Sequence, residues 1–237
     1  MKNFVIIDGN NHLLIGYNAV LRNQPSSDED LSNKLYHIIS MMIQVLKRKF
    51  SSEFYVCWDT AGGTSLRKKL DPSYKSNRDH SKINFDIMES CKGIYEDYGI
   101  KSISIPRCEA DDAIFALCRV LKEKNSQSRI TIVSRDHDLI QVVQKGYATE
   151  IYDPIKKSVL EIPWYDIVKF KALIGDSSDC ISGVKGIGEK SALKILSGKV
   201  TLKEDQKKEY EKCLLLVDAE KNPQYKSNYE SLKLIFT

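Results

Sequence analysis

Three acidic residues cluster at 108–112 of this 237-residue chain, where the sequence reads CEADD. Glu109, Asp111 and Asp112 place three carboxylates within four positions, directly before an apolar run. Such a cluster is typical of a helix N-terminus, where the helix dipole stabilises negative charge. It is also the set of oxygen donors that hard divalent cations prefer. Taken alone, the cluster leaves both interpretations open.

Other acids follow short apolar runs that are typical of buried strands. FVIID at 4–8 and EFYVCWD at 53–59 each end in aspartate, and RITIVSRDHD at 129–138 ends in an Asp-x-Asp pair. KSISIP at 101–106 is a further strand-like run and directly precedes the acidic cluster. One aspartate after a strand is ordinary helix capping. Acids after four successive strands indicate a shared site.

Strands that alternate with helical patterns predict an α/β domain with a mainly parallel sheet, flanked by helices. The carboxyl ends of such strands meet at one edge of the sheet, where ligands bind. We therefore expect one crevice lined by Asp8, Asp59, Glu109, Asp111, Asp112, Asp136 and Asp138. With four histidines and no CxxC pair, magnesium or manganese fits this crevice better than zinc. Two such ions are the usual device for cleaving phosphodiesters.

Composition agrees with a soluble globular protein, because 42% of the residues are hydrophobic and 29% are charged. No apolar run approaches the roughly 18 residues that span a bilayer, and the start MKNFVIIDG is not a signal peptide. Six unpaired cysteines indicate reduced thiols. We expect a cytoplasmic protein with no membrane partner.

Basic residues gather in two segments, although the net charge is only +4. Residues 44–82 contain nine Lys or Arg against four acids, and residues 185–208 contain seven Lys against three acids. Basic segments beside acidic clusters suggest a polyanion held near bound metal. Ordinary solvated charge is the alternative interpretation.

From 163 onward the pattern changes to a helix, a glycine-rich turn and a second helix that begins at Glu189. Gly183, Gly186 and Gly188 permit a tight turn with positive φ. Asp176 and Asp179, three positions apart, are expected to face the same way at the end of the first helix. The amides of such a turn can bind a phosphate backbone without reading bases. A plain turn between two packed helices is the alternative.

Other elements are expected from periodicity and turn residues. Apolar positions predict a helix at 33–50, and a further helix is expected at about 203–219. A hairpin is expected at 150–162, turning at Asp153-Pro154.

Five blocks together resemble one family, the phage and bacterial 5′-nucleases or flap endonucleases, including the 5′-nuclease domain of bacterial DNA polymerase I. These blocks are VIIDGNN, CWDTAGGTSLRKKLDPSYKSNR, EADD, SRDHDL and KALIGDSSDCISGVKGIGEKSA, in family order over roughly 4–198. The YKSNRD segment resembles the phage form. The resemblance implies a PIN-like α/β catalytic domain at 1–162, with a helical arch at about 76–98. It implies a helix-hairpin-helix (H3TH) DNA-binding subdomain and a C-terminal helical region at 163–237.

The resemblance also implies two divalent ions, Mg²⁺ or Mn²⁺, and a catalytic pair of cations. The first ion would be held by Asp8, Asp59, Glu109 and Asp111, and the second by Asp136, Asp138, Asp176 and Asp179, with Asp112 acting through water. Lys75 and Arg78, one helical turn apart at the base of the arch, would contact the scissile phosphate.

For DNA, the resemblance implies contacts from Tyr74 near the entering nucleotide, although a core tyrosine is the alternative. Contacts with the duplex backbone would come from Gly183, Lys185, Gly186, Gly188, Lys190 and Lys194. A potassium ion would be held by Ser178 and by the carbonyls of Val184 and Ile187. Cys180 and Ser182 stand where the family usually has Asn and Pro, which puts the K⁺ site in question.

The function expected from these features is that of a monomeric, metal-dependent, structure-specific 5′-nuclease. Its substrates would be DNA with 5′ flaps, nicks or 5′ ends, and RNA–DNA hybrids if it removes RNA primers during replication. The alternative is a single-stranded ribonuclease of the PIN type, a class that lacks the basic YKxxR segment and the glycine-rich clamp. A binding module without catalysis is a third hypothesis, and no expected acid is missing to support it.

Overall fold

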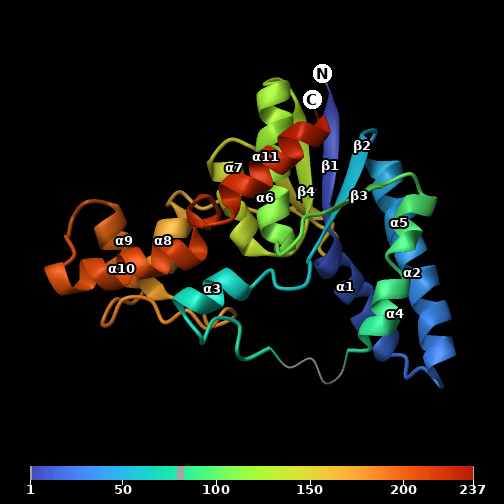
Figure 1. Ribbon diagram of the computed structural model, residues 1–237, viewed down its shortest axis with the longest axis horizontal. Helices are drawn as coiled ribbons and strands as arrows, with labels where there is room; N and C mark the ends of the chain where they lie inside the picture. Colours follow the sequence, from blue (N-terminus) through green and yellow to red (C-terminus); the bar gives the residue numbers. More distant parts are fainter. Residues whose placement is uncertain (1, 79–82, 237) are drawn as a thin grey trace.

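The protein is described by a computed structural model that covers residues 2–78 and 83–236. Its centre is a six-stranded sheet in the order β3-β2-β1-β4-β5-β6, shown in Figure 1. The strands are β1 (Asn3–Asp8), β2 (Glu53–Trp58), β3 (Lys101–Ser104), β4 (Arg129–Val133), β5 (Glu150–Asp153) and β6 (Ser158–Val159). All neighbouring pairs are parallel except β5 and β6, which form an antiparallel hairpin. The predicted mainly parallel sheet and the predicted hairpin are confirmed.

Helices surround this sheet and extend from it to one side. They are α1 (Gly9–Leu21), α2 (Asp28–Lys49), α3 (Ser65–Leu70), α4 (Phe85–Ser90), α5 (Gly93–Asp97), α6 (Ala110–Lys124), α7 (Ile140–Gln144), α8 (Ile167–Ile174), α9 (Glu189–Leu196), α10 (Glu204–Val217) and α11 (Tyr225–Phe236). Short 3₁₀ helices lie at His137–Leu139 and Ala219–Lys221. None of the helices in these described ranges combines the length and apolarity needed to cross a bilayer.

Both faces of the sheet are buried, as a parallel sheet requires. Successive side chains of β1 point to opposite faces: Val5 and Ile7 pack in the core beneath α1, α2 and α5, whereas Phe4 and Ile6 pack in the core beneath α6. Figure 1 shows these helix groups on the two sides of the strands. The continuous apolar runs read from the sequence are therefore explained by burial on both faces.

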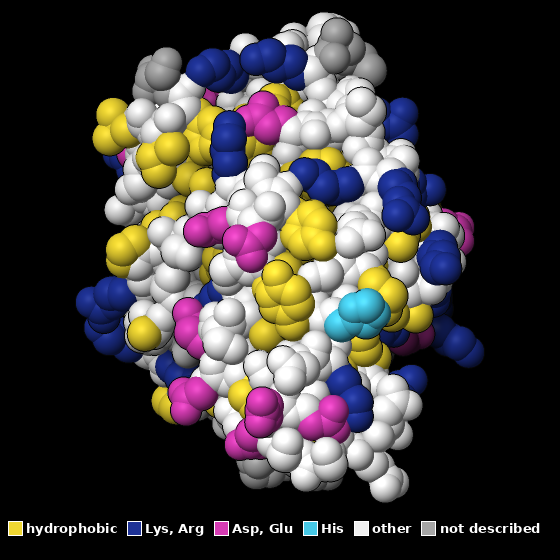
Figure 2. Space-filling view, turned by 90° about the vertical axis from the view of Figure 1, so that its right-hand side faces the viewer, with side chains coloured by type: hydrophobic (Ala, Val, Ile, Leu, Met, Phe, Trp, Pro, Cys, Tyr) yellow, Lys and Arg dark blue, Asp and Glu magenta, His cyan; other side chains and the backbone are white. Residues whose placement is uncertain are grey.

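Helix α2 separates its charges along its length. Its first turn is acidic, and its last turn contains Lys47, Arg48 and Lys49, both as the helix dipole favours. Figure 2 views this side of the molecule, with basic side chains along the top and acidic ones frequent in the lower half. Because α2 ends just before β2 begins, its basic end lies at the amino ends of the strands. This part of the basic segment 44–82 is therefore remote from the strand-end acids, contrary to expectation.

The glycine-rich turn joins α8 to α9, and α10 packs against α8. Gly183 has φ +70° and Gly186 has φ +80°, as predicted. Gly188 is instead the N-cap of α9 with φ −98°, so the predicted positive φ is wrong there. Asp176 and Asp179 lie in the loop beyond α8 rather than on the helix, and Asp176 forms a backbone bridge with Ile181.

The end of the chain returns to the sheet. Leu232 of α11 is fully buried in the core beneath α6, and Tyr225 contacts the ring of Phe115 edge-on at 5.6 Å. The helix predicted at 203–219 is confirmed as α10, whereas α11 had no clear sequence signal. The boundary at 162 stays a prediction, but the final helix packs with the α/β part.

The predicted arch at 76–98 includes residues 79–82, which lie outside the described residues. Its described part contains α4 and α5. Ile94 and Tyr95 of α5 are buried in the core beneath α2, whereas Phe85 at the start of α4 is 54% exposed. Ile87 of α4 and Cys91 belong to the same core, so much of the described part of this segment is packed, and the arch stays a prediction.

Two glycines of the turn provide a matched test of its packing. A Cβ added to Gly183 would lie 2.3 Å from the Gly175 nitrogen, whereas one added to Gly186 would meet nothing within 4 Å. Both have positive φ, so both Gly→Ala changes incur the same backbone strain of about 1 kcal/mol. We expect Gly183→Ala to lower the free energy of unfolding by about 2 kcal/mol more than Gly186→Ala, measured by urea titration. Equal losses would contradict the close approach of Gly183 to Gly175.

Candidate active site

A cleft of about 430 Å³ opens at the carboxyl ends of the strands. Its polar lining consists of Asp8, Asn10, Asn11, Asp59, Lys75, Arg78, Glu109, Asp111 and Asp136, and its apolar lining of Leu14, Ile83, Phe85 and Met88. The acids come from the end of β1, the residue after β2, the start of α6 and the loop after β4. The structure therefore brings together five of the seven acids that the sequence placed in one crevice, whereas Asp112 and Asp138 line a neighbouring cavity.

Asp8 is the most deeply buried acid of this group. It is 4% exposed, caps α1 by accepting from the Asn11 amide at 3.1 Å, and accepts from Ser134 Oγ at 2.7 Å. Ser134 is close because β4 pairs with β1 in parallel register. Burial raises the pKa of Asp8 to about 7, and the charges of Asp136 and Asp59 act in the same direction.

Asp59, Asp111 and Asp136 share the cleft with Asp8. Asp59 accepts from the Ala110 amide at 2.7 Å, and Asp136 accepts from the Asp138 amide at 2.8 Å. Burial raises the pKa of Asp111 well above its ordinary value, and the charges of Asp136 and Asp8 raise it further. In the part of the chain that the structure describes, none of these four acids forms a salt bridge within 4.0 Å. We call these four acids the first cluster.

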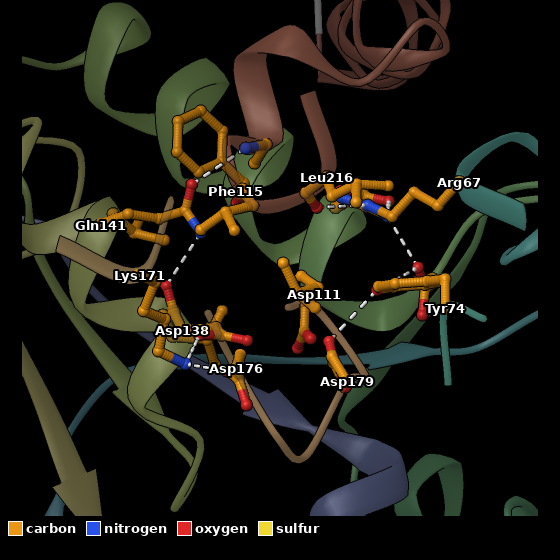
Figure 3. A pocket seen from close by; sticks show the side chains of 17 residues that line it. Arg67, Tyr74, Asp111, Phe115, Asp138, Gln141, Lys171, Asp176, Asp179 and Leu216 are labelled. Carbon is orange, nitrogen blue, oxygen red and sulfur yellow. Dashed lines mark hydrogen bonds and ion pairs between the residues drawn. The ribbon is translucent and has the colours of Figure 1, made fainter. Parts of the chain in front are cut away.

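Asp138 and Asp176 form a second cluster, which lies against a lysine. Lys171 Nζ contacts Asp138 and lies 2.6 Å from Asp176 Oδ2, as Figure 3 shows. Burial and the charge of Asp136 raise the pKa of Asp138 to about 6, although Lys171 opposes this shift. Burial lowers the pKa of Lys171, but the two carboxylates outweigh burial and hold it above its ordinary value.

Lys75 and Arg78 also pair with acids of the cleft. Lys75 Nζ contacts Glu109 and lies 3.7 Å from Asp179 Oδ2, while Arg78 Nη2 lies 3.1 Å from Asp179 Oδ1. Lys75 has φ +53° and lies in a turn, so the expected helical spacing of these two residues is wrong. Their predicted catalytic role remains a prediction.

Tyr74 is a core residue in this structure. Its side chain is 3% exposed, and its hydroxyl lies 3.3 Å from both Glu109 Oε2 and Asp179 Oδ2. A ring buried beneath the cleft has no face to offer an entering nucleotide, so the expected DNA contact of Tyr74 is wrong. The tyrosine instead helps to hold two acids in place.

Asp112 points away from the first cluster and binds Arg67. The Arg67 guanidinium donates to both oxygens of Asp112, at 2.8 and 2.7 Å, and to Glu109 Oε2 at 2.6 Å. Asn222 donates to the same Asp112 carboxylate at 2.7 Å, and Arg67 Nε donates to the Leu216 carbonyl at 3.0 Å. Asp112 therefore pairs with Arg67 and Asn222 in this structure, and its expected water-mediated metal role stays a prediction.

Arg67 and Lys171 are the site residues that sequence reasoning missed. Arg67 lies inside one of the family blocks, but it is followed by two further cations, Lys68 and Lys69. Only the phase of α3 turns Arg67 inward while Lys68 and Lys69 remain exposed. Lys171 lies five positions before Asp176 in the block KALIGDSSD, and because Asp176 lies in the loop beyond α8, helical spacing gave no signal for their contact.

The donor chemistry of the cleft fits a hard divalent cation. Within residues 2–78 and 83–236, no three His, Cys, Asp or Glu side chains are already gathered closely enough to hold a metal. Lys171, Lys75 and Arg78 form ion pairs with some of these acids, and their positive charges neutralise carboxylates that a metal ion would otherwise neutralise. The first cluster nevertheless offers carboxylate oxygens without a cation, and a buried Asp8 that a cation would stabilise.

The helical part places most of the predicted duplex contacts on its surface. Lys185, Gly186, Gly188 and Lys190 are exposed around the start of α9 and Lys194 is exposed in its last turn, whereas Gly183 is buried.

The predicted potassium ligands are only partly brought together. Ser178 donates to Asp176 Oδ1 at 2.5 Å, while the Val184 carbonyl accepts from the Ile187 amide at 3.1 Å. Ser178 therefore belongs to the acid side of the loop in this structure, and the potassium site stays a prediction.

A family model for the N-terminal, resolvase-like domain of 5′-3′ exonucleases matches residues 3–172. The chain belongs to the 5′-3′ exonuclease family. It is 32% identical to the 5′-3′ exonuclease of Buchnera aphidicola subsp. Schizaphis graminum over 206 residues, which cover 82% of this chain and 70% of that protein. Family membership confirms the resemblance read from the sequence and makes this chain a nuclease, an enzyme of the hydrolase class.

Two further relatives illustrate the range of the family. DNA polymerase I of Caldicellulosiruptor bescii is 31% identical over 214 residues, which cover 84% of this chain but 25% of that protein. A crystal structure of a bacteriophage T5 flap endonuclease variant, in a pseudo-enzyme–product complex with DNA and metal ions, has a TM-score of 0.69. Its sequence identity is 18%, and 99% of each chain is covered. That likeness shows that the fold is shared.

The Arg67 contacts predict a large stability effect. Arg67→Met would leave the buried carboxylate of Asp112 with only Asn222 as partner, and breaking a buried pair this way typically costs 3–5 kcal/mol. We expect a loss of about 3 kcal/mol or more in the free energy of unfolding, measured by urea titration. Lys68→Met, at an exposed position of the same helix, should change stability by less than about 0.5 kcal/mol. A loss no larger than the Lys68 control would contradict the proposed role of this ion pair.

The raised pKa of Asp8 predicts how stability depends on pH in EDTA. Asp8 keeps its proton up to about pH 7 in the folded protein, whereas the unfolded chain loses it near the ordinary value of 3.8. The unfolded state therefore binds fewer protons between these values, and stability falls as pH rises from about 4 to about 7.

Asp8→Asn removes the contribution of Asp8 to the pH dependence of stability. We expect the variant to show a flatter pH profile in EDTA and a gain on the order of 2 kcal/mol at pH 7.5, measured by urea titration. Asp97→Asn, at an exposed site, should follow the wild-type profile. If the difference between Asp8→Asn and wild type did not change with pH, burial would not be the cause of the shift.

Proposed function

We propose that this protein is a metal-dependent, structure-specific 5′-nuclease that hydrolyses DNA phosphodiesters at 5′ flaps, nicks and 5′ ends. The observation that carries this proposal is the first cluster, four acids without a cation in a cleft that also presents Lys75 and Arg78. Such a cleft suits a phosphodiester only when cations fill the acids, because phosphate and carboxylate repel each other. The names of the relatives support the same activity.

The proposed cofactors are two divalent ions, Mg²⁺ or Mn²⁺, and the T5 complex with metal ions supports this choice. The residues proposed to hold them are Asp8, Asp59, Glu109 and Asp111 for one ion, and Asp136, Asp138, Asp176 and Asp179 for the other. Bound there, the ions supply an activated water and neutralise charge on the phosphoryl oxygens. Asp112 is not part of this set, because it serves Arg67.

Lys75 and Arg78 are proposed to stabilise the charge of the scissile phosphate. They now neutralise Glu109 and Asp179 at the floor of the cleft. Burial lowers the pKa of Lys75, but Glu109 and Asp179 outweigh burial and raise it, so the lysine stays charged at neutral pH. Lys75 therefore acts as a fixed positive charge rather than as a proton donor.

The exposed start of α9 is proposed to bind the duplex backbone, with Lys185, Lys190 and Lys194 contacting phosphates. A potassium ion at the carbonyls of Val184 and Ile187, the division at residue 162 and action as a monomer belong to the same proposal. The physiological role would be flap or RNA-primer removal, which the polymerase relative supports.

The proposed metal chemistry gives a direct test. Wild-type protein should cleave a 5′-labelled flap in Mg²⁺ and not in EDTA. Asp136→Ala should lower the cleavage rate at least about 1,000-fold, while the Kd for the flap in EDTA should change less than about threefold. His137→Ala, at the exposed neighbouring position, is the control and should cleave at close to the wild-type rate. Cleavage by Asp136→Ala at the wild-type rate would refute the assignment of the acids.

The alternatives are separated by substrate. Flap, nicked duplex, RNA-primed duplex and unstructured RNA should be compared side by side. Preference for unstructured RNA would favour the PIN-type ribonuclease, and tight flap binding without turnover in Mg²⁺ or Mn²⁺ would favour a binding module.

A further inference from the structure

Lys171 lies where a divalent ion would otherwise hold the second cluster together. It extends from α8, and its ammonium group contacts the carboxylates of Asp138 and Asp176 at once. Its side chain is 17% exposed, so the contact is largely screened from solvent. Figure 3 shows the nitrogen of Lys171 between these two acids, with Asp111 and Asp179 facing the same cavity.

The two clusters differ in whether a cationic side chain contacts their acids. Among the described residues, no lysine, arginine or histidine forms a salt bridge within 4.0 Å with Asp8, Asp59 or Asp111 of the first cluster. The second cluster already has its counter-charge. The ion proposed for Asp8, Asp59, Glu109 and Asp111 therefore meets protein cations only at Glu109, whereas the ion proposed for the other acids meets Lys171 at both members of the second cluster.

The second cluster has little space behind it and an open groove in front of it. The cavity behind it, lined by Asp111, Asp138, Asp176 and Lys171, has a volume of about 30 Å³, room for about one water. Lys171 also lines an open groove of about 660 Å³ on the other side of the loop, together with Arg135 and His137. A displaced lysine can therefore move outward into this groove.

We propose that Lys171 is a built-in cation of the second cluster, which neutralises Asp138 and Asp176 in the metal-free protein and must move out before a divalent ion binds there. This inference rests on the proposed metal binding by the two clusters. Its consequence is ordered loading: the first cluster fills at low metal concentration, and the second fills only when the ion outcompetes the lysine. Lys171 is thus a positioning residue that sets the affinity of one metal site.

The test counts bound Mn²⁺ by electron paramagnetic resonance of the free ion, without DNA and without turnover. Lys171→Met keeps the length of the side chain and removes its charge. We expect this variant to bind its second Mn²⁺ at least about tenfold more tightly than wild type, with the first Kd changed less than about threefold. Lys171→Arg, which keeps the charge, should bind the second ion no more tightly than wild type.

Lys169→Met is the matched control, because Lys169 lies on the same helix, is 57% exposed and pairs only with Asp166 among the described acids. It should bind both ions as wild type does. Equal second-site affinities for wild type and Lys171→Met would overturn the inference, and so would weaker binding by Lys171→Met.

A second measurement keeps the inference testable if Lys171→Met does not fold. A crystal structure of the wild-type protein soaked in Mn²⁺ should show the ion at Asp138 and Asp176 and Lys171 Nζ outside hydrogen-bond distance of both. An ion bound there with Lys171 still in contact with both acids would overturn the inference.

These results are independent of the proposed function. If wild type failed to cut flaps while Lys171→Met still gained second-site affinity, the function would fall and the inference would stand. If wild type cut flaps but wild type and Lys171→Met had equal second-site affinities, the inference would fall and the proposed function would stand.

Discussion

The mutual repulsion of carboxylates at one sheet edge is the constraint on which the rest of this structure depends. Parallel strands deliver their final residues to the same edge, so acids that are far apart in sequence become neighbours in a partly dry cleft. The groups around these acids lower the electrostatic free energy of placing the carboxylates so close together. Backbone amides at helix starts donate to Asp8 and Asp136, and hydroxyl groups of Ser134 and Tyr74 donate to Asp8 and Glu109. Lys75, Arg78 and Lys171 pair with Glu109, Asp179 and the second cluster, respectively.

The neutralisation of buried carboxylates also explains how the helical part is joined to the sheet. Arg67, on the short helix α3, links Glu109 at the cleft to Asp112 on α6 and to the Leu216 carbonyl at the end of α10. Asn222 completes the same buried group from the segment that leads into α11. The polar network that fixes an active-site acid is therefore also the joint between the two parts of the chain. A displacement of this joint would therefore also move Glu109.

Local patterns in the sequence were sufficient for the sheet, the strand-end acids and the tight turn at Gly183, because these follow from apolar runs and from residues with special backbone freedom. Local patterns were insufficient to predict which side chains contact each other in the folded protein. Asp111 and Asp112 are adjacent, yet about 100° of helical rotation sends one to the cleft and the other to Arg67. Tyr74 and Lys75 are likewise defined by contacts with Asp179, a hundred positions away. Composition cannot distinguish Arg67 from the lysines that follow it, because only tertiary packing turns one of them inward.

The buried group of Arg67, Asp112 and Asn222 has a consequence for the history of this chain. Asp112 accepts hydrogen bonds from both Arg67 and Asn222, and all three side chains are at most 6% exposed. A change at one position is harmful until its partners change, and a single substitution must pass through a state with an unpaired buried charge. The three positions lie in different parts of the chain, so we expect them to change together, and the segment before α11 is thereby coupled to the cleft.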